Sequence, residues 1–375
     1  MIGDMNRPKN EYEAGFAGNP NAVAKQLLEA IALGDALGAT TEFLDVVKAI
    51  KATTQYRCRG YPFVPVGGGW LHLRPGDHTD DTDMALGLLK GLRESGDADF
   101  SPAVAANWSE WLAGGPPDVG STVRAIVGNP RFIVDPFGVS RDLYQSNPGR
   151  CANGALMRNG ITGAAADLPR AFDWSLKQGI MTHYHPLSAA CCAVQTWLIR
   201  EGVAGRWPFD EYPDWLDEWK QQWTAWLDGS PDPVVRRWHS DVREGGRLEA
   251  ALQTLGAAEF DPDAFVPFTD TGFPERNGWA LLSLQVAVWA MRWARRPADA
   301  FPFRLHPAIA HHFVDVLDVF ARRGHEAIGW VPLVGWDVDT YGAIAGPLIA
   351  AACGGPFPER MTETLAVRKI GWLFQ

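Results

Sequence analysis

Residues 76–84 read Gly76-Asp77-His78-Thr79-Asp80-Asp81-Thr82-Asp83-Met84, which places four carboxylates and two threonine hydroxyls directly before an apolar run. The run Met84, Leu86, Leu88, Leu89, Leu92 predicts a helix, so the acidic residues lie on the turn that enters it. Asp and Thr are good N-caps because their side-chain oxygens accept hydrogen bonds from the free N–H groups of a first turn. A cap needs only one such residue, whereas many anions at one point repel each other unless a cation intervenes. Capping and a site for Mg²⁺, Mn²⁺ or Ca²⁺ are therefore the two interpretations of this stretch alone.

A second Asp/Thr cluster, Asp337-Val338-Asp339-Thr340, precedes a helix of small residues near the other end of the chain. Two such loops at helix N-termini can face one another and share cations. The first would supply Thr79, Asp80 and Asp81, and the second would supply Asp337, Asp339 and Thr340. Oxygen donors from two loops fit a binuclear site with a metal separation of roughly 3.5–4 Å. The second cluster is not a haloacid-dehalogenase motif, because Tyr341 stands where that motif has Thr or Val.

Helical periodicity recurs along the chain. The predicted segments begin at 21 with Asn21 as N-cap, at 101 and at Ser121, and also include 189–198, 215–226, 278–294 and 306–323. Asp118 is interpreted either as the cap of the helix at Ser121 or as a catalytic group, and the local sequence favours neither. Gly34 and Gly38, among small residues at the end of the first helix, indicate close backbone packing or close approach to a ligand. Asp35 and Glu42 are the polar exceptions there, and local evidence favours plain helix-end charges.

Composition narrows the class of protein. The chain has 375 residues, 46% hydrophobic and 21% charged, as in ordinary globular proteins. A formal net charge of −10 argues against nucleic-acid binding. Five cysteines with no CxxC pattern predict reduced thiols. With neither a signal peptide nor a membrane-length apolar run in sight, we expect a cytoplasmic protein.

Two further loops carry polar groups ahead of helices. Residues 146–160 are rich in Gly and Asn, and their backbone N–H groups could meet an anionic or ribose oxygen. Residues 181–186 contain His183 and His185, whose spacing is not that of a helical zinc site, so ordinary hydrogen bonding is the favoured interpretation. The triple glycine at 67–69 is not followed by Lys-Ser/Thr, which excludes a Walker motif.

The domain organisation is predicted to be a flexible arm over 1–20 and a single domain over 21–375. A tryptophan-rich segment at about 205–275 is interpreted as an insertion or cover. Its residues Trp215, Trp219, Trp223 and Trp226 fall at helical spacing, and such a stripe is more often packing than a cofactor site.

Taken in series, the motifs resemble the ADP-ribosylhydrolase (ADP-ribosylglycohydrolase) family, and within it the dinitrogenase reductase-activating glycohydrolase branch. The residues that carry the resemblance are Gly34-Asp35-Ala36-Leu37-Gly38, Glu42-Phe43, Thr79-Asp80-Asp81-Thr82, Pro117-Asp118-Val119-Gly120, Asn153-Gly154-Ala155-Leu156-Met157-Arg158, Thr182-His183-Tyr184-His185-Pro186 and Asp337-Val338-Asp339-Thr340. The resemblance implies an all-α fold with a central cleft, two divalent cations (Mg²⁺ or Mn²⁺), and hydrolysis of the bond between ADP-ribose and a modified side chain, typically arginine.

The resemblance also implies roles for single residues. Asp118 would carry out acid/base work on the ribose, Asp81 or a metal-bound water would take part in activation, and Glu42 would line the entrance or touch a metal. Asn153, Gly154, His183 and Ser121 would hold the substrate. Val338, Tyr341 and the tryptophan-rich segment depart from many members, which leaves the metal ligands intact and bears on the substrate protein.

Three other functions remain open at this point. One is a Mg²⁺-dependent hydrolase of free ADP-ribose-like nucleotides or phosphoesters. Another is an immunity protein that occludes an ADP-ribosylating toxin through the arm or the tryptophan-rich segment, with or without hydrolysis. A catalytically dead member is disfavoured by the intact Asp80, Asp81, Asp337 and Asp339.

Overall fold

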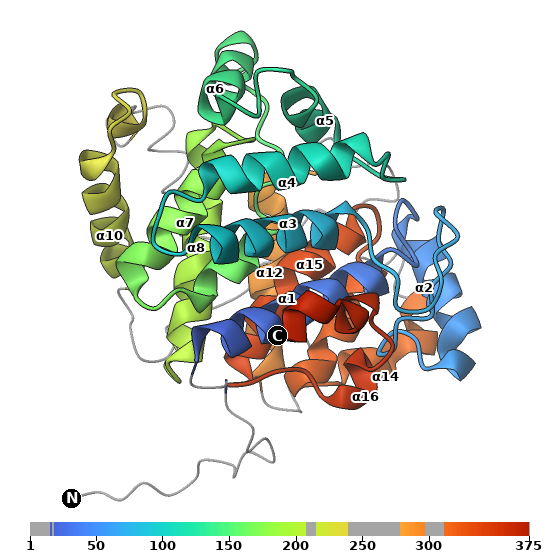
Figure 1. Cartoon of the computed structure of the whole chain (residues 1–375). Helices are drawn as coiled ribbons and strands as arrows, with labels where there is room; N and C mark the ends of the chain where they lie inside the picture. Colours follow the sequence, from blue (N-terminus) through green and yellow to red (C-terminus); the bar gives the residue numbers. More distant parts are fainter. Residues whose placement is uncertain (1–15, 17–18, 208–214, 239–277, 297–310, 375) are drawn as a thin grey trace, which may run out of the picture.

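A computed structural model describes residue 16 and residues 19–207, 215–238, 278–296 and 311–374. Within these ranges the chain is helical, with two isolated β-bridges and no strand (Figure 1). The α-helices are α1 (Pro20–Gly38), α2 (Val46–Tyr56), α3 (Asp80–Ser95), α4 (Ser101–Ala113), α5 (Ser121–Val127), α6 (Pro136–Ser146), α7 (Leu168–Ile180), α8 (Pro186–Val203), α10 (Trp215–Gly229), α12 (Ala280–Ala294), α14 (Leu317–Phe320), α15 (Val338–Ala352) and α16 (Glu359–Thr362). The 3₁₀ segments are η1 (Arg57–Arg59), η2 (Asn159–Ala164), η3 (Val235–Arg237), η5 (His311–Val316), η6 (Gly324–Leu333), η7 (Ala366–Lys369) and η8 (Gly371–Phe374). The predicted helical fold is confirmed.

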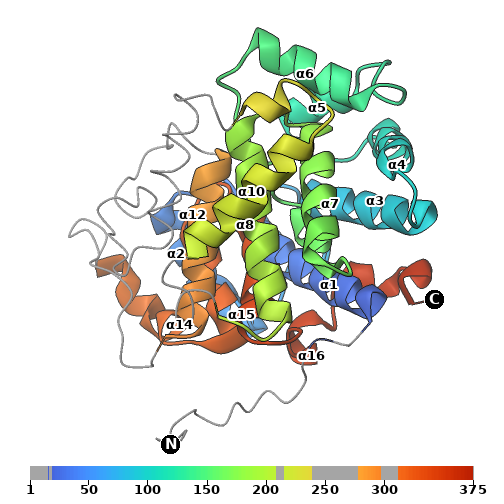
Figure 2. The ribbon, with the colours of Figure 1, turned by 90° about the vertical axis from the view of Figure 1, so that its left-hand side faces the viewer.

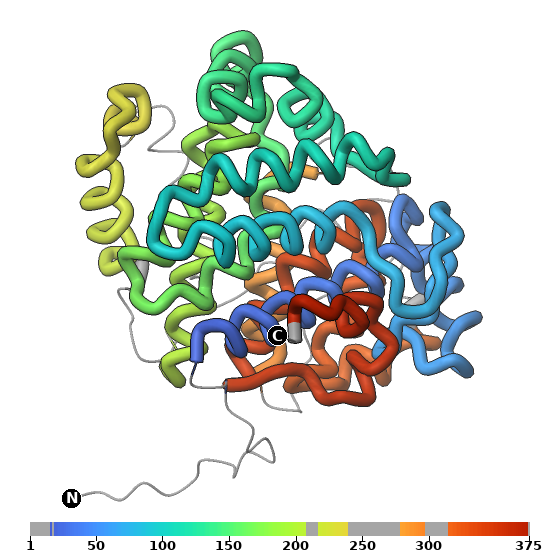
Figure 3. Tube along the Cα trace, viewed as in Figure 1, coloured from blue at the N-terminus to red at the C-terminus, as the bar shows by residue number. Residues whose placement is uncertain are grey.

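Two helices from opposite ends of the sequence form the centre of the molecule. Figure 3 shows α1, in blue, beside the red α15, and the two share the most extensive helix–helix contact. α15 is buried along its whole length and α1 is buried from residue 30 to its end, while Lys25, Gln26 and Glu29 form a partly exposed polar stripe on the first half of α1. The first and last long helices of the described chain thus pack against each other.

Glycines set the separation of α1 and α15. A Cβ atom at Gly34 would lie 1.8 Å from the carbonyl oxygen of Gly342, and one at Gly342 would lie 2.1 Å from that of Gly34. Likewise a Cβ at Gly38 would lie 2.2 Å from the Val338 oxygen, and one at Gly346 would lie 2.0 Å from the Ala30 oxygen. The contacts repeat every fourth residue along two antiparallel helices, so the backbones touch with no side chain between them. The close packing indicated by Gly34 and Gly38 is confirmed.

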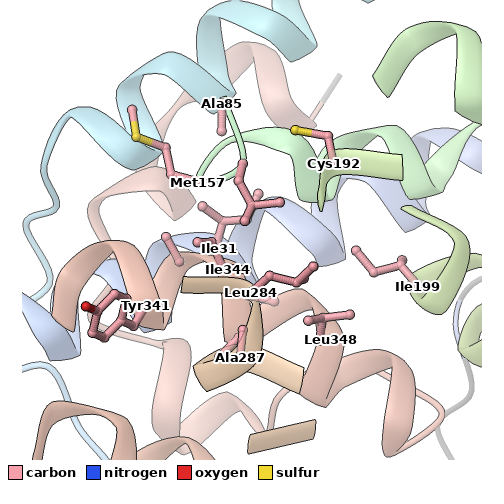
Figure 4. Close-up of a cluster of buried hydrophobic side chains, with 14 of the residues drawn as sticks. Ile31, Ala85, Met157, Cys192, Ile199, Leu284, Ala287, Tyr341, Ile344 and Leu348 are labelled. Carbon is pink, nitrogen blue, oxygen red and sulfur yellow. The ribbon is translucent and has the colours of Figure 1, made fainter. Parts of the chain in front are cut away.

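Further helices surround this pair. α8 and α12 pack on α15, while α3 packs on α1 and carries α4 on its outer side (Figures 1 and 2). Ile31 of α1, Ile344 of α15 and Leu284 of α12 gather in one buried cluster (Figure 4). This packing leaves the start of α3, the end of α1 and the start of α15 adjacent.

The tryptophan-rich segment is described only in part. Trp219 and Trp223 of α10 are buried, their rings stack at 5.6 Å, and α10 packs on α8, so this part of the stripe serves packing. Residues 208–214 and 239–277, and nearly all of the predicted arm over 1–20, lie outside the described residues.

Two local predictions and one of the two interpretations of Asp118 were wrong. The N-cap of α1 is Asn19 rather than Asn21, because Pro20 can take the first helical position, where its missing N–H costs nothing. The N-cap position of α5 is Gly120, so Asp118 does not cap that helix. In place of one helix over 306–323, the described part of this segment holds the 3₁₀ segment η5 and the single turn α14.

Two expectations from composition can be compared with the structure. All five cysteines are free thiols, as predicted. Among the described helices, none is long and apolar enough to cross a membrane.

We predict that Gly34→Ala destabilises the protein by about 3 kcal/mol, because the new methyl group forces α1 and α15 apart in a core that cannot relax. The measurement is urea unfolding followed by circular dichroism. The matched control is Gly229→Ala at the end of α10, where a Cβ meets nothing within 4 Å. Equal unfolding midpoints for the two variants would contradict the glycine contact.

Candidate active site

The side chain of Asp35 caps the N-terminus of α3. It lies in the last turn of α1 and is fully buried. Its carboxylate accepts hydrogen bonds from the backbone N–H groups of Thr79 (3.0 Å) and Thr82 (3.1 Å) and from both threonine hydroxyls. Thr79, at the N-cap position, makes no cap of its own, so a carboxylate from another helix caps α3. The interpretation of Asp35 as a plain helix-end charge was wrong.

The carboxylates converge in two sets. Asp35, Asp81 and Asp339 form one, and Glu42, Asp337 and Asp339 form the other. Within each set one carboxyl oxygen per residue lies within 4.8 Å of the others. Asp339 belongs to both, so the two sets are adjacent. The predicted meeting of the two Asp/Thr loops therefore occurs, and α1 joins them.

Burial and mutual repulsion act on the innermost acids. Burial raises the pKa of Asp81 well above its ordinary value, and the charge of Asp35 adds to the effect. Burial likewise raises the pKa of Asp339, with Glu42 adding to it. Crowded carboxylates out of water hold protons unless a cation takes the protons' place.

The donor set fits divalent cations. Asp81 Oδ1 and Asp339 Oδ1 are buried and have no hydrogen-bond partner among the residues that the structure describes. The single hydroxyl proton of Thr79 faces three carboxylate oxygens, on Asp35 (3.0 Å), Asp81 (3.2 Å) and Asp339 (3.4 Å), and can satisfy only one. Unsatisfied carboxylate oxygens in two adjacent sets are what hard, oxygen-binding cations require.

A cleft of about 370 Å³ opens above these acids. Most of the candidate residues line it, namely Glu42, Asp80, Asp118, Ser121, Asn153, Gly154, His183, Asp337, Asp339 and Thr340. Thr79 and Asp81 are not among the lining residues, because they lie beneath the floor beside Asp35. The position of Asp81 suits a cation ligand better than proton transfer to a substrate.

The acids that face the cleft are also perturbed. Burial raises the pKa of Glu42 to about 9, that of Asp80 to about 7 and that of Asp337 to about 6. The negative charge of Asp118 contributes to all three shifts. Burial raises the pKa of Asp118 itself, against the opposing charge of Arg124. Strongly perturbed acids gathered in one cleft are typical of a functional site.

Asn153 ties the second acidic loop to its surroundings. Its amide nitrogen donates to Asp337 Oδ2 (2.6 Å) and to Ser283 Oγ on α12 (2.9 Å). Its backbone N–H donates to the carbonyl of Gly278 (2.9 Å). The amide nitrogen is thus engaged with the protein, and it holds one acid of the second set in place.

The two histidines of the 181–186 loop separate in the structure. His183 lines the cleft. His185 is the N-cap of α8 and accepts a hydrogen bond from the backbone N–H of Leu187 (3.1 Å). Ordinary hydrogen bonding is therefore confirmed for His185.

An aromatic pair to which the sequence assigned no role lies beside Glu42, and its member Phe43 lines the cleft. Phe43 and Trp70 are 47% and 46% exposed, and their ring centroids are 5.5 Å apart. Trp70 Nε1 donates to Glu42 Oε2 (2.6 Å). Phe43 has a φ of 61°, which is strained for a non-glycine residue, and its N–H donates to the carbonyl of Trp336, itself at φ 69°. Such strain persists where the surroundings enforce it, and it often marks a functional site.

Comparisons with known proteins agree with this geometry. The ADP-ribosylglycohydrolase family model matches residues 23–373. The chain is 37% identical over 179 residues to the ADP-ribosyl-[dinitrogen reductase] glycohydrolase of Rhodospirillum rubrum, covering 47% of this chain and 56% of that protein. It is 31% identical over 192 residues to the ADP-ribosylarginine hydrolase Tri1 of Serratia proteamaculans, covering 48% of each. The aligned part thus spans about half the length of these curated relatives.

A solved structure, an ADP-ribosylglycohydrolase-related protein complex, shares the fold over nearly the whole chain. Its TM-score is 0.58 at 21% identity, with 94% of this chain and 95% of that chain covered. The structural likeness supports the fold, and the family model confirms the family that the sequence motifs resemble. The chain belongs to the ADP-ribosylglycohydrolase family.

Proposed function

We propose that this protein is a metal-dependent hydrolase that removes ADP-ribose from a modified protein side chain, and that the side chain is arginine. The observation that carries the proposal is the pair of acidic sets joined by Asp339 at the floor of the cleft. Two relatives act on ADP-ribosyl linkages by name, one on dinitrogen reductase and one on arginine, which supports the substrate class.

The residues that would hold the cations come from α1, α3 and α15, from the turn after α1 and from the N-cap of α15. Asp35, Asp81 and Asp339 surround one position, and Glu42, Asp337 and Asp339 surround the next, with Asp80, Thr79 and Thr340 alongside. When bound, divalent cations supply positive charge that holds and polarises ribose hydroxyls. The carboxylates would keep that charge at the floor of the cleft, and a ribose bound there would hold its C1″ carbon at a constant place.

Asp118 is the group best placed for proton transfer. It lines the cleft, belongs to neither acidic set and has a pKa raised by burial. Hydrolysis breaks the bond from C1″ to the leaving nitrogen and forms a bond from C1″ to the oxygen of water. The water loses one proton and the leaving nitrogen gains one, and a carboxyl group at the side of the ribose can take and return it.

Divalent cations should stabilise the folded protein measurably. At one hundred times the dissociation constant, Mn²⁺ or Mg²⁺ adds about 2.7 kcal/mol to the free energy of unfolding. Asp339→Asn should abolish this gain because Asp339 serves both sets, and without cations the variant should be at least as stable as wild type, since a neutral amide replaces a buried acid that the neighbouring carboxylates crowd. Melting temperatures with Mn²⁺, Mg²⁺ or EDTA measure both effects. The control is Asp97→Asn, whose side chain is 88% exposed. A wild-type response from Asp339→Asn would contradict the proposed ligand.

Asp118→Asn should lower kcat for release of ADP-ribose from an arginine-modified protein by about 10²–10⁴-fold, because it removes the proton-transfer group and keeps the shape. The cation-induced rise in melting temperature should remain, which separates this variant from Asp339→Asn. Release of labelled ADP-ribose is the measurement, again with Asp97→Asn as control. Undiminished release by Asp118→Asn would refute this role.

The aromatic pair Phe43 and Trp70 supports arginine as the linked side chain, because a guanidinium beside an aromatic face is stabilised by about 0.5–2 kcal/mol. Phe43→Leu should therefore reduce kcat/KM on ADP-ribosylarginine about 5-fold and leave ADP-ribosylserine turnover unchanged. Phe43→Tyr, which keeps the ring and meets the same backbone strain, is the matched control. An equal loss on both linkages would argue against a guanidinium at this position.

A further inference from the structure

Arg158 is a buried cation whose hydrogen-bond partners in the described chain are all neutral groups. It is fully buried, directly after the loop that carries Asn153 and Gly154. Its guanidinium donates to the Gly154 carbonyl (2.6 Å), to the side-chain and backbone oxygens of Gln178 (2.8 and 3.0 Å) and to Thr182 Oγ1 (2.6 Å). It also lies 4.2 Å from the ring centroid of Trp108. A buried charge held this firmly can orient the groups that it touches.

The bond to Thr182 fixes the direction of the next one. A guanidinium has donors and no acceptor, so Thr182 Oγ1 must accept from Arg158. Thr182 Oγ1 is 2.9 Å from Nδ1 of His183. If His183 Nδ1 carried the proton, the hydroxyl would accept from both neighbours and its own buried proton would be left without an acceptor in this chain of bonds. Thr182 therefore donates to His183 Nδ1, and the imidazole proton lies on Nε2.

The resulting donor belongs to the cleft. His183 is 3% exposed and lines the cleft, while its Nε2 atom has no hydrogen-bond partner in the described chain. The ring lies so close to Gly154 that a Cβ there would be 2.9 Å from His183 Cε1. Burial and the charge of Arg158 lower the pKa of His183 well below its usual value, so the ring is neutral. The Nε2–H group of His183 therefore needs a hydrogen-bond acceptor, which a ligand in the cleft can supply.

We infer that Arg158 and Thr182 are positioning residues that hold His183 as its neutral Nε2–H tautomer, so that Nε2 donates to an oxygen of the bound ADP-ribosyl group. The ligand's identity rests on the function proposed above, whereas the tautomer does not. Arg158 acts on the ligand through Thr182 and His183 and need not contact the ligand itself.

The direct test is ¹⁵N NMR of the full-length protein labelled at histidine, with the His183 signals assigned from the spectrum of His183→Gln. The wild type should show a protonated Nε2 and an unprotonated Nδ1. Thr182→Val removes the hydroxyl at nearly constant shape and should lose this preference, whereas Thr182→Ser keeps the hydroxyl and should retain it. Arg158→Lys, whose single ammonium cannot serve Gly154, Gln178 and Thr182 from the same positions, should give a mixture. Far-UV circular dichroism confirms that each variant is folded.

Binding of ADP-ribose gives the second readout. Thr182→Val should weaken ADP-ribose affinity about 10-fold by calorimetry, as expected for a donor that no longer points at its acceptor, while Thr182→Ser should bind as the wild type does. A protonated Nδ1 in the wild type, or His183 signals unchanged in both Thr182→Val and Arg158→Lys, would overturn the inference. Failure of the protein to release ADP-ribose from any substrate would refute the proposed function alone, since the tautomer is read without substrate.

Discussion

The backbones of α1 and α15 are in direct contact, and this contact sets the positions of the acidic residues. Glycines at 34, 38, 342 and 346 let two helices from opposite ends of the chain touch along their backbones. Because the helices are antiparallel, the end of α1 meets the start of α15, and Asp35 comes to lie beside Asp339. Asp35 then caps α3 and brings the first acidic loop to the second. The glycine contacts take no part in the reaction, yet they bring the carboxylates together.

That assembly is costly without a cation. Carboxylates of both sets have raised pKa values because of burial, and two of their oxygens have no hydrogen-bond partner in the described part of the chain. Isolated buried charges are unfavourable, so packing and hydrogen bonds must hold these carboxylates in place. Asp35 accepts such bonds from the start of α3, and Asn153 donates one to Asp337. The crowded carboxylates lower the stability of the folded protein, and the same crowding favours the binding of divalent cations. Such a trade-off between stability and function is common at functional sites.

Much of this could be predicted from the sequence, because its strongest signals are local. Helical periodicity and the two Asp/Thr loops placed α3, α15 and their acids without any structure. The role of Asp35 could not be predicted because it depends on a tertiary contact. Nothing near Asp35 in the sequence shows that it caps a helix more than 40 residues away. The pair Phe43 and Trp70 could not be predicted for a similar reason, since exposure beside a cleft and a positive φ have no sequence pattern. The separation of Asp81 from the cleft also required coordinates.

The function proposed here requires that Asp339 be shared by two cations beneath one cleft. Anomalous diffraction from crystals grown with Mn²⁺ and ADP-ribose, recorded at the manganese absorption edge, tests it most directly. We expect two adjacent peaks, one among Asp35, Asp81 and Asp339 and the other among Glu42, Asp337 and Asp339, with the ribose above them. A map with peaks only elsewhere, or with none between these carboxylates, would contradict the account.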